Sequence, residues 1–365
     1  MRIAHLVSHA ALNGVATSSR TLIQAQLNAG HQVLLVHSRN SWIERQAFTG
    51  PIDMLASDLA TTPAEIRRVG YAIRDWGHEV VHAHGSRGNK HAMVYRCAAG
   101  TPIVMTAHTR QPQLPWAFAH EVIAPSAQTA DYYLSRLLVR RKHMHVVPHM
   151  FDIRSVAPVS HPLRAAARAS LGLRPEAFVI GSVGDICPRK NQLDMVTVLA
   201  RLVAAGIDAE LLLIGLFADT AREDLWGAAL RDPLVAGRVH LVGERNDGVA
   251  MMGAMDAYLC TSRMEEGPIA TLEAMATELP VLTVDVGYSS ELIVDGESGH
   301  LFGHGDVDAM AGTAATLAGD ATLRGAIGAA ARRAVARLEP PAIVSRIEQV
   351  YRLAAARARQ KPAQK

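Results

Sequence analysis

The sequence predicts an α/β protein of two domains, each built on a doubly wound parallel sheet. Three observations support this prediction. The chain has 365 residues, which is long for one ordinary domain and enough for two separate cores. Short apolar runs alternate with helix-length segments in both halves. A Pro-rich segment at residues 157–162 separates the two series, and we expect the domain boundary there, with a ligand cleft between the domains.

The elements of the first half follow in order along the chain. A strand is expected at residues 2–7, followed by a turn that contains Gly14 and a helix from about Ala16 to Ala29, which Gly30 ends. A strand, a glycine turn, a helix and a second strand form the unit of a doubly wound sheet. The remaining strands are expected at residues 31–38, 79–85, 101–108, 121–126 and 144–149.

The second half repeats the pattern. Strands are expected at residues 177–185, 209–217, 238–244, 257–262, 280–287 and 299–303, with helix-length spacers between them. A long last helix is expected over about residues 341–359, with a frayed charged tail. Ligands of open parallel sheets bind at the carboxyl ends of the strands, so the loops that follow these strands are the first place to look for a site.

Composition restricts the classes of protein. Hydrophobic residues make up 49% of the chain and charged residues 19%, and no apolar run approaches the roughly 18 residues that span a bilayer. The N-terminus lacks the pattern of a signal peptide, so we expect a cytoplasmic protein. The three cysteines, Cys97, Cys187 and Cys260, lie far apart and are expected to be reduced and mostly buried, with no zinc or redox spacing.

The charge is divided unevenly. Residues 1–155 contain 16 Lys and Arg against 9 Asp and Glu, an excess of seven positive charges, whereas the rest of the chain has 21 against 25. A basic first half is expected to attract an anionic partner, such as lipid headgroups, nucleic acid or a phosphorylated ligand.

The stretch EEGPIATLEAMA, residues 265–276, places carboxylates around the start of an apolar helix. Pro268 suits the first helical position, which puts Glu265 in the preceding loop and Glu273 on the second turn. At about 1.5 Å rise per residue the two carboxylates would lie roughly 8 to 12 Å apart. An anion held at the helix N-terminus would sit between them, and a diphosphate flanked by two sugars has that shape. The alternative is that the acidic residues only complement the helix dipole.

Several motifs resemble the retaining GT-B glycosyltransferases of the family-four type, also described as glycosyl transferases group 1. They are GSVGDICPRKNQLDMV, GAMDAYLCTSRMEEG, the pair of glutamates with seven residues between them, and GYSSELI. Looser matches in the first half are NGVATSSRTL, EVVHAHGS, MTAHT, VIAPSAQTADYY and VVPHMFD. The resemblance covers nearly the whole chain, and its specific part runs from about residue 180 to 303.

The resemblance implies two Rossmann-like domains and a nucleoside-diphosphate sugar as donor, with no metal or other cofactor. Residues 1–156 would bind the acceptor, residues 157–340 the donor, and residues 341–365 would cross back to the first domain. By position, the residues implied at the reacting centre are Glu265, Lys190 and His108. Those implied in donor binding are Glu273, Asn13, Gly14, Gly184, Arg189, Glu244, Gly267, Pro268, Ile269 and Glu291.

The chain departs from the family pattern at three places. Asp185 stands where the family usually has an arginine, beside the proposed diphosphate. This reversal leaves open whether catalysis is weakened or abolished. The HMFD turn keeps only Asp152 of the usual interdomain motif. Glu278 stands where a helix-ending glycine is usual, and a left-handed conformation there would cost roughly 1 kcal/mol.

Other polar patterns were weighed for metal or surface binding. Asp306-Val307-Asp308 spells a metal motif of other glycosyltransferases, but an Asp that opens a helix is an ordinary N-cap. His82 and His84 share a strand face, as do His143, His145 and His149, yet no carboxylate or thiol completes a metal set at recognisable spacing. The segment YYLSRLLVRRK could contact an anionic membrane through Tyr132, Arg136, Arg140, Arg141 and Lys142, or could simply pack with a solvated basic end.

The function that these patterns favour is a retaining, metal-independent glycosyltransferase, hexosyltransferase-like, acting on a glycan or lipid-linked acceptor in cell-surface polysaccharide or glycolipid synthesis. Its expected location is the cytoplasm, with the inner face of the cell membrane as the alternative. Two alternatives stay open: a sugar-nucleotide epimerase or hydrolase on the same fold, and a non-catalytic homologue that binds nucleotide sugar. Nucleic-acid binding is not expected, because no aromatic platform accompanies the basic residues.

Overall fold

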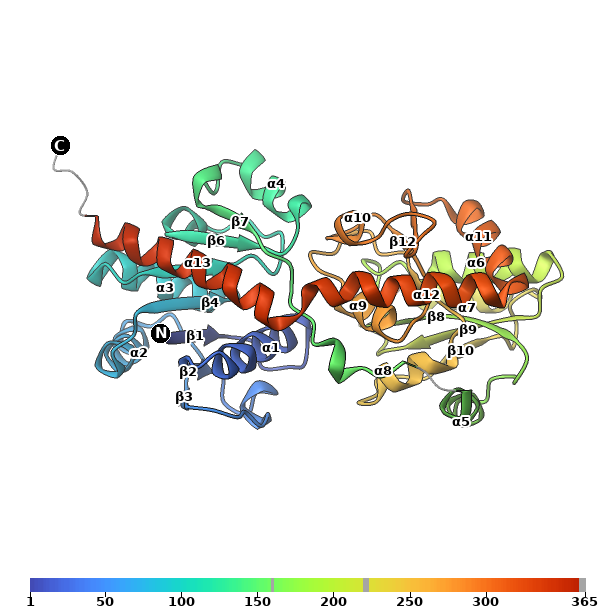
Figure 1. The fold of residues 1–365 in the computed structure, drawn as a ribbon, viewed down its shortest axis with the longest axis horizontal. Coiled ribbons are helices and arrows are strands. Elements are labelled where there is room, and N and C mark those ends of the chain that lie inside the picture. The colour runs from blue at the N-terminus through green and yellow to red at the C-terminus, as the bar shows by residue number, and fades with distance from the viewer. Residues whose placement is uncertain (159–160, 219–222, 361–365) are drawn as a thin grey trace. The chain divides into compact units, whose positions relative to one another are not determined.

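The chain folds into two compact units in a computed structural model that describes residues 1–158, 161–218 and 223–360 (Figure 1). The first domain contains Met1–Phe151 and the chain from Leu338 onward, and the second contains Asp152–Arg337. Each is built on a parallel sheet, as predicted. Part of the predicted linker and the predicted frayed tail, residues 361–365, lie outside the described residues.

The first domain has a seven-stranded parallel sheet in the order β3-β2-β1-β4-β5-β6-β7. Its strands are β1 (Arg2–Val7), β2 (Gln32–His37), β3 (Ile52–Ala56), β4 (Val80–His84), β5 (Ile103–Thr106), β6 (Glu121–Ala124) and β7 (Met144–Val146). The sequence analysis missed β3. This strand lies at the sheet edge and is only partly buried, so it lacks the continuous apolar run that identifies central parallel strands.

The helices of the first domain are α1 (Gly14–Asn28), α2 (Pro63–Trp76), α3 (Ser86–Ala99), α4 (Ala127–Ser135) and α13 (Pro340–Arg359). Helix α1 begins because the Asn13 side chain accepts a hydrogen bond from Ala16 N. It ends at Asn28, shortly before Gly30, which has a φ of +83°. Helix α13 packs against α1 and against β4, β5 and β6.

The two faces of the first sheet differ in chemistry. One face is apolar and packs against α2 and α3, with Leu6 and Val81 in its core. On β1 and β4, alternation places His5, His82 and His84 on the opposite face, where they contact Gln26 of α1 and Tyr351 of α13.

The second domain has a six-stranded parallel sheet in the order β10-β9-β8-β11-β12-β13. Its strands are β8 (Phe178–Val183), β9 (Ala209–Ile214), β10 (Val239–Leu241), β11 (Ala257–Cys260), β12 (Val281–Val284) and β13 (His300–Phe302). Its helices are α5 (His161–Leu171), α6 (Leu193–Ala204), α7 (Glu223–Leu230), α8 (Gly248–Met251), α9 (Ile269–Ala276), α10 (Ser289–Leu292), α11 (Val307–Gly319) and α12 (Ala321–Val335).

Both sheets have a topological switch point, where the strand order reverses. The reversal lies between β1 and β4 in the first domain and between β8 and β11 in the second. The loops that follow these strands diverge and leave a crevice at the carboxyl edge of the sheet, where ligands of such sheets bind. The two switch points therefore locate a candidate site in each domain.

Three smaller expectations can be compared with the structure. The cysteines are unpaired, but only Cys260 is buried, Cys187 is half-buried and Cys97 is exposed, so the expectation of mostly buried thiols was wrong. Cys97 lies near the exposed end of α3. Glu278 has a φ of +66°, which confirms the left-handed conformation. No helix in the described ranges is long and apolar enough to cross a membrane.

Candidate functional site

The two loops at the switch point of the second domain are joined by hydrogen bonds. Thr261, directly after β11, donates its hydroxyl to the carbonyl oxygens of Asn191 and Lys190 at 2.9 and 3.2 Å. Arg263 N donates to the Arg189 carbonyl at 2.8 Å. The loop after β8 and the loop after β11 thus support each other, and they carry Lys190 and Glu265 respectively.

Glu265 is the centre of a charged cluster. Its Oε1 lies 2.7 Å from Lys190 Nζ and 2.8 Å from Arg189 Nη1, and it accepts a hydrogen bond from Ser262 Oγ at 3.0 Å. Burial alone would raise the pKa of the Glu265 carboxyl, but the charges of Lys190 and Arg189 outweigh it and hold the pKa below its usual value. Two cations share this carboxylate, so the cluster has an excess of positive charge.

The position of Lys190 depends on the glycine that follows β8. Gly184 has a φ of +138°, and a Cβ added there would lie 3.5 Å from Lys190 Nζ. The amine therefore extends over bare backbone toward Glu265. Any larger residue at position 184 would be strained by this backbone conformation, although its Cβ would only reach ordinary van der Waals contact with the Lys190 side chain.

Helix α9 begins beside this cluster. Pro268 precedes the helix, which starts at Ile269, one residue later than predicted. The carbonyl of Pro268 accepts from Thr271 N at 3.0 Å, so the N–H groups of Ile269 and Ala270 have no partner within the helix. Gly287, after β12, packs on this turn: its φ is +62°, and a Cβ there would lie 2.9 Å from Pro268 Cδ. Helix N-termini with such N–H groups are common binding places for anions.

Glu273 lies on the second turn of α9, as predicted, and is half-buried. Burial raises the pKa of its carboxyl to about 7. Among the described residues its carboxyl group has no hydrogen-bond partner. A neutral pH therefore leaves this carboxyl group partly protonated, and a ligand with hydroxyl donors would favour its ionised form.

Tyr288 is a residue that sequence reasoning missed. Its side chain is 2% exposed, and its hydroxyl is buried with no hydrogen-bond partner in the described structure. Burial raises the pKa of this hydroxyl, and the charges of Glu265 and Glu273 raise it further. The charges of the two predicted glutamates therefore both act on the pKa of one buried tyrosine. Its place inside the GYSSELI motif was the only signal in the sequence.

Of the other predicted donor residues of the second domain, Glu244 and Glu291 are exposed and Gly267 is half-buried. Arg189, which pairs with Glu265, is also exposed. Asp185 is also exposed, and among the described contacts its carboxylate forms no ion pair with Lys190 or Arg189. The charge reversal at this position therefore leaves the Glu265 cluster intact.

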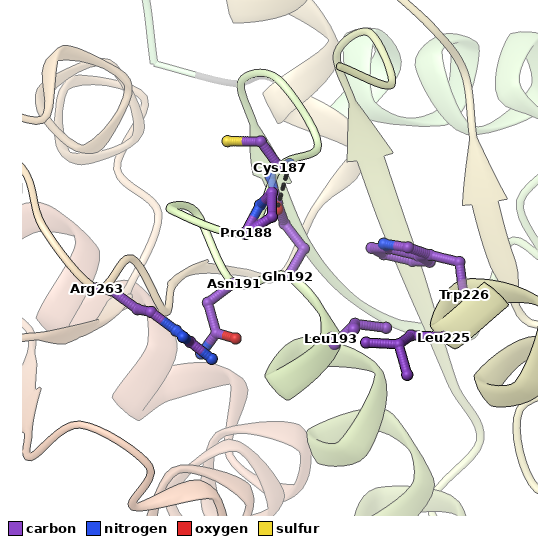
Figure 2. Close-up of a pocket in the computed structure, with 8 residues that line it drawn as sticks. All are labelled: Cys187, Pro188, Asn191, Gln192, Leu193, Leu225, Trp226 and Arg263. Atoms are coloured by element: carbon purple, nitrogen blue, oxygen red, sulfur yellow. Dashed lines mark hydrogen bonds between the residues drawn. The ribbon is translucent and has the colours of Figure 1, made fainter. Parts of the chain in front are cut away.

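A small pocket of about 80 Å³ lies on the α6 side of the loop after β8. Figure 2 shows Trp226 and Leu225 facing Leu193, with Arg263 beside Asn191. None of the predicted site residues lines this pocket. The residues that line it include Asn191 and Gln192, which directly follow Lys190. The pocket is too small to hold a sugar nucleotide.

The predicted residues of the first domain lie at its own switch point. Asn13 and Gly14 are exposed at the start of α1, after β1. His108 follows β5, is half-buried, and its Nε2 lies 3.0 Å from His84 Nδ1. Its ring stacks on that of His149, with centroids 5.6 Å apart. Burial holds the pKa of His108 well below its usual value, so the ring is neutral at pH 7.

The candidate metal patterns have other partners. His145 pairs with Glu121 at 2.7 Å while His149 stacks on His108, so the predicted trio with His143 does not gather. Asp308 pairs with Arg201 at 2.8 Å. Across the residues with described positions, the one group with metal-like spacing is formed by His5, His82 and His84.

Comparisons with known proteins identify the family of the chain. Residues 164–334 match the family model described as glycosyl transferases group 1, and residues 12–155 match the model of glycosyltransferase family 4. The chain belongs to the GT-B glycosyltransferases of the family-four type.

Particular relatives fall in the same group. A phosphatidyl-myo-inositol mannosyltransferase of Mycolicibacterium smegmatis is 25% identical over 93% of this chain and 89% of its own length. A UDP-Gal:alpha-D-GlcNAc-diphosphoundecaprenol alpha-1,3-galactosyltransferase of Escherichia coli is 23% identical over 64% of each chain. The structure of HepE from Anabaena, in complex with UDP and glucose, matches with a TM-score of 0.82 at 19% identity, over 96% of this chain and 98% of that one. This last likeness confirms the fold.

Proposed function

We propose that the protein is a retaining glycosyltransferase that uses a nucleoside-diphosphate sugar. The observation that carries the proposal is the cluster at the second switch point, where Lys190 and Arg189 converge beside the open N-terminus of α9. A diphosphate carries at least two negative charges, and this place offers two cations and the N-terminus of a helix. Glu273 would accept the ribose hydroxyls, and Glu265 would be released to the hydroxyls of the transferred sugar.

The transfer step follows from this placement. The bond from the sugar C1 to the diphosphate oxygen breaks with both electrons on that oxygen, while the acceptor hydroxyl oxygen bonds to C1 from the same face. The hydroxyl proton passes to the departing diphosphate, which is then the nearest base. Lys190 stabilises the charge that develops on the diphosphate, and this interaction grows stronger as the bond breaks.

The acceptor is proposed from the relatives and from the charge of the first domain. The mannosyltransferase and the galactosyltransferase named above act, by their names, on a phosphatidylinositol and on a diphosphoundecaprenol-linked sugar. A glycan or lipid-linked acceptor is therefore the favoured class for this chain. The excess of basic residues in the first half suits a phosphorylated lipid head group.

A basic surface at the end of α4 would bring the enzyme to such an acceptor at the inner face of the membrane. Arg136, Arg140, Arg141 and Lys142 are exposed there, Leu137 is 91% exposed, and the Arg136 guanidinium stacks on Tyr132 at 3.8 Å. Each basic residue near an anionic membrane contributes about 1 kcal/mol. Binding to vesicles with anionic lipid, absent for neutral vesicles and lost in Arg140→Glu, would support this contact.

The experiment incubates the protein with UDP-, GDP- and ADP-sugars and candidate lipid-linked acceptors after treatment with EDTA. Transfer from one donor class, with the product keeping the donor's anomeric configuration, is the expected result. Inversion of that configuration, or a requirement for added divalent metal, would contradict the mechanism. Donor conversion without any acceptor would favour the epimerase or hydrolase alternative, and binding with no turnover would favour the non-catalytic one.

A further inference from the structure

A continuous chain of hydrogen bonds crosses the interior of the first domain and ends at His108. Gln26 Oε1 lies 2.7 Å from His5 Nε2, and His5 Nδ1 lies 3.0 Å from His84 Nε2. His84 Nδ1 in turn lies 3.0 Å from His108 Nε2. Gln26 and His5 are fully buried and His84 is 1% exposed, so water is not available to replace any of these links. We call Gln26, His5, His84 and His108 the histidine relay.

A side branch completes the hydrogen bonding of Gln26. Its Nε2 donates to the Tyr351 hydroxyl at 2.8 Å, which lies 2.7 Å from His82 Nδ1. His82 Nε2 lies 2.7 Å from Thr106 Oγ1. Both polar atoms of the Gln26 amide are therefore used, and the orientation of this amide decides which atom faces His5.

The orientation of the Gln26 amide determines which nitrogen of each histidine ring in the relay carries the proton. Burial lowers the pKa of His5 to about 4 and holds those of His84 and His108 well below the usual value, so each ring is neutral with one N–H and one lone pair. Because Gln26 Oε1 can only accept, His5 donates through Nε2 and accepts at Nδ1. His84 must then donate through Nε2 and accept at Nδ1, and His108 must donate through Nε2. Turning the Gln26 amide over would reverse every link together.

The same rings are close enough for a metal ion, since one nitrogen from each of His5, His82 and His84 lies within 4.8 Å of the others. A metal needs a free lone pair from each ligand. Here the nitrogens of these rings are already matched, donor to acceptor, with each other or with Gln26, Tyr351, Thr106 and His108. The geometry therefore favours a hydrogen-bond relay over a metal site.

We propose that the histidine relay fixes the tautomer of His108, so that Gln26, His5 and His84 are positioning residues and His108 presents an unprotonated Nδ1. His108 is half-buried at the switch point, and its Nδ1 has no hydrogen-bond partner among the described residues. This nitrogen would accept a hydrogen bond from a sugar hydroxyl. That last role rests on the proposed function, whereas the tautomer itself does not.

The test reads the ring nitrogens directly, by ¹⁵N spectra of histidine-labelled protein, with His108 assigned from a His108→Gln sample. We expect a single His108 tautomer protonated at Nε2, and couplings between nitrogens across the His5–His84 and His84–His108 hydrogen bonds. If the wild-type protein shows a mixture of His108 tautomers, or protonation at Nδ1, that result by itself overturns the proposal. Loss of these couplings on adding one equivalent of Zn²⁺ would overturn it in favour of a metal site.

Three variants test the direction of control. Gln26→Met removes the acceptor three residues along the relay from His108, and we expect it to abolish the single tautomer. Gln26→Glu keeps an acceptor toward His5 and should preserve Nε2 protonation. His91→Phe is the matched control, since His91 is another buried histidine with both nitrogens hydrogen-bonded, to Tyr95 and Ala60, outside the relay. An unchanged His108 tautomer in folded Gln26→Met would contradict the proposal.

Activity provides a separate readout. If the tautomer of His108 serves transfer, Gln26→Met should lower kcat/KM by up to about tenfold, the value of one neutral hydrogen bond, and Gln26→Glu should restore most of it. A changed tautomer with unchanged transfer would overturn the assigned role in the reaction. Absence of transfer in the wild-type protein would reject the proposed function and leave the spectroscopic result standing.

Discussion

The histidine relay of the first domain and the site around α9 in the second domain differ in how completely their hydrogen bonds are matched. In the histidine relay every internal nitrogen has a partner, and the rings are neutral. In the second domain Glu273 has a raised pKa and the Tyr288 hydroxyl is buried without a partner in the described structure. Unmatched buried groups cost free energy. A bound ligand could therefore stabilise Glu273 or Tyr288, whereas the internal nitrogens of the histidine relay already have partners.

The largest effect is expected from Lys190. Lys190→Ala should lower kcat for transfer by about 10²- to 10³-fold, because it removes a charge that stabilises the departing diphosphate. The fold should survive, since Arg189 still pairs with Glu265 at 2.8 Å. Steady-state kinetics measure the change, with Arg201→Ala as the control, because Arg201 pairs only with exposed Asp308 among the ion pairs described. Equal kcat values for Lys190→Ala and the control would contradict the role given to Lys190 in stabilising the departing diphosphate.

Glu273 should show the cost of an unmatched group. The carboxyl has a pKa of about 7 in the folded protein against about 4.5 unfolded, so the folded state binds more protons between these values. Its contribution to stability is therefore fully present below pH 4.5 and is lost as the pH rises through 7, a difference of about 3 kcal/mol. Urea unfolding should show Glu273→Gln to be more stable than wild type at pH 8, with a smaller gain at pH 5. The same gain at both pH values would mean that titration is not its cause.

A matched pair of tyrosines compares the domains directly. Tyr351→Phe removes a hydroxyl that contacts Gln26 and His82, and it should lower the free energy of unfolding by about 1–3 kcal/mol. Tyr288→Phe removes a hydroxyl without a partner in the described structure, and it should be neutral or stabilising. Denaturant unfolding of both variants measures the difference. Equal losses of unfolding free energy in the two variants would mean that a hydroxyl with hydrogen-bond partners and one without contribute the same to stability.

The smallest effect concerns strain away from the site. Glu278 adopts a φ of +66° at the end of α9, and Glu278→Gly should raise stability by about 1 kcal/mol without changing donor affinity. Its ion pair with Arg332 is long, at 3.9 Å, and contributes little. Thermal unfolding with and without nucleotide checks both parts. A change in donor affinity would show that this strain belongs to the site.

The fold was largely predictable because apolar runs that end in polar or small residues mark central parallel strands. The prediction failed at β3, where an edge strand with exposed Asp53 and Met54 lacks that pattern. The start of α9 was placed within one residue because Pro268 restricts where a helix can begin. Local sequence therefore sufficed for the central strands and for the start of α9, but not for β3.

The contacts of the site were less predictable, because they join residues far apart in the sequence. The spacing of His82 and His84 indicated a shared face, but His82 is hydrogen-bonded to Tyr351 of α13, and His84 to His5 of β1 and to His108 after β5. The turn at Gly287, directly before Tyr288, packs against Pro268, which lies 19 residues earlier in the sequence. The roles given to the predicted residues in binding and catalysis stay predictions until a ligand is tested.

The most direct test of the central claim is calorimetric titration of the protein with UDP-, GDP- and ADP-sugars near pH 7, in two buffers of different ionisation enthalpy. The account predicts that one nucleotide class binds with release of a fraction of a proton, since hydroxyl donors favour ionised Glu273, and that Glu273→Gln loses both the affinity and the proton release. Binding that is unchanged in Glu273→Gln, or no binding of any nucleotide sugar, would contradict it.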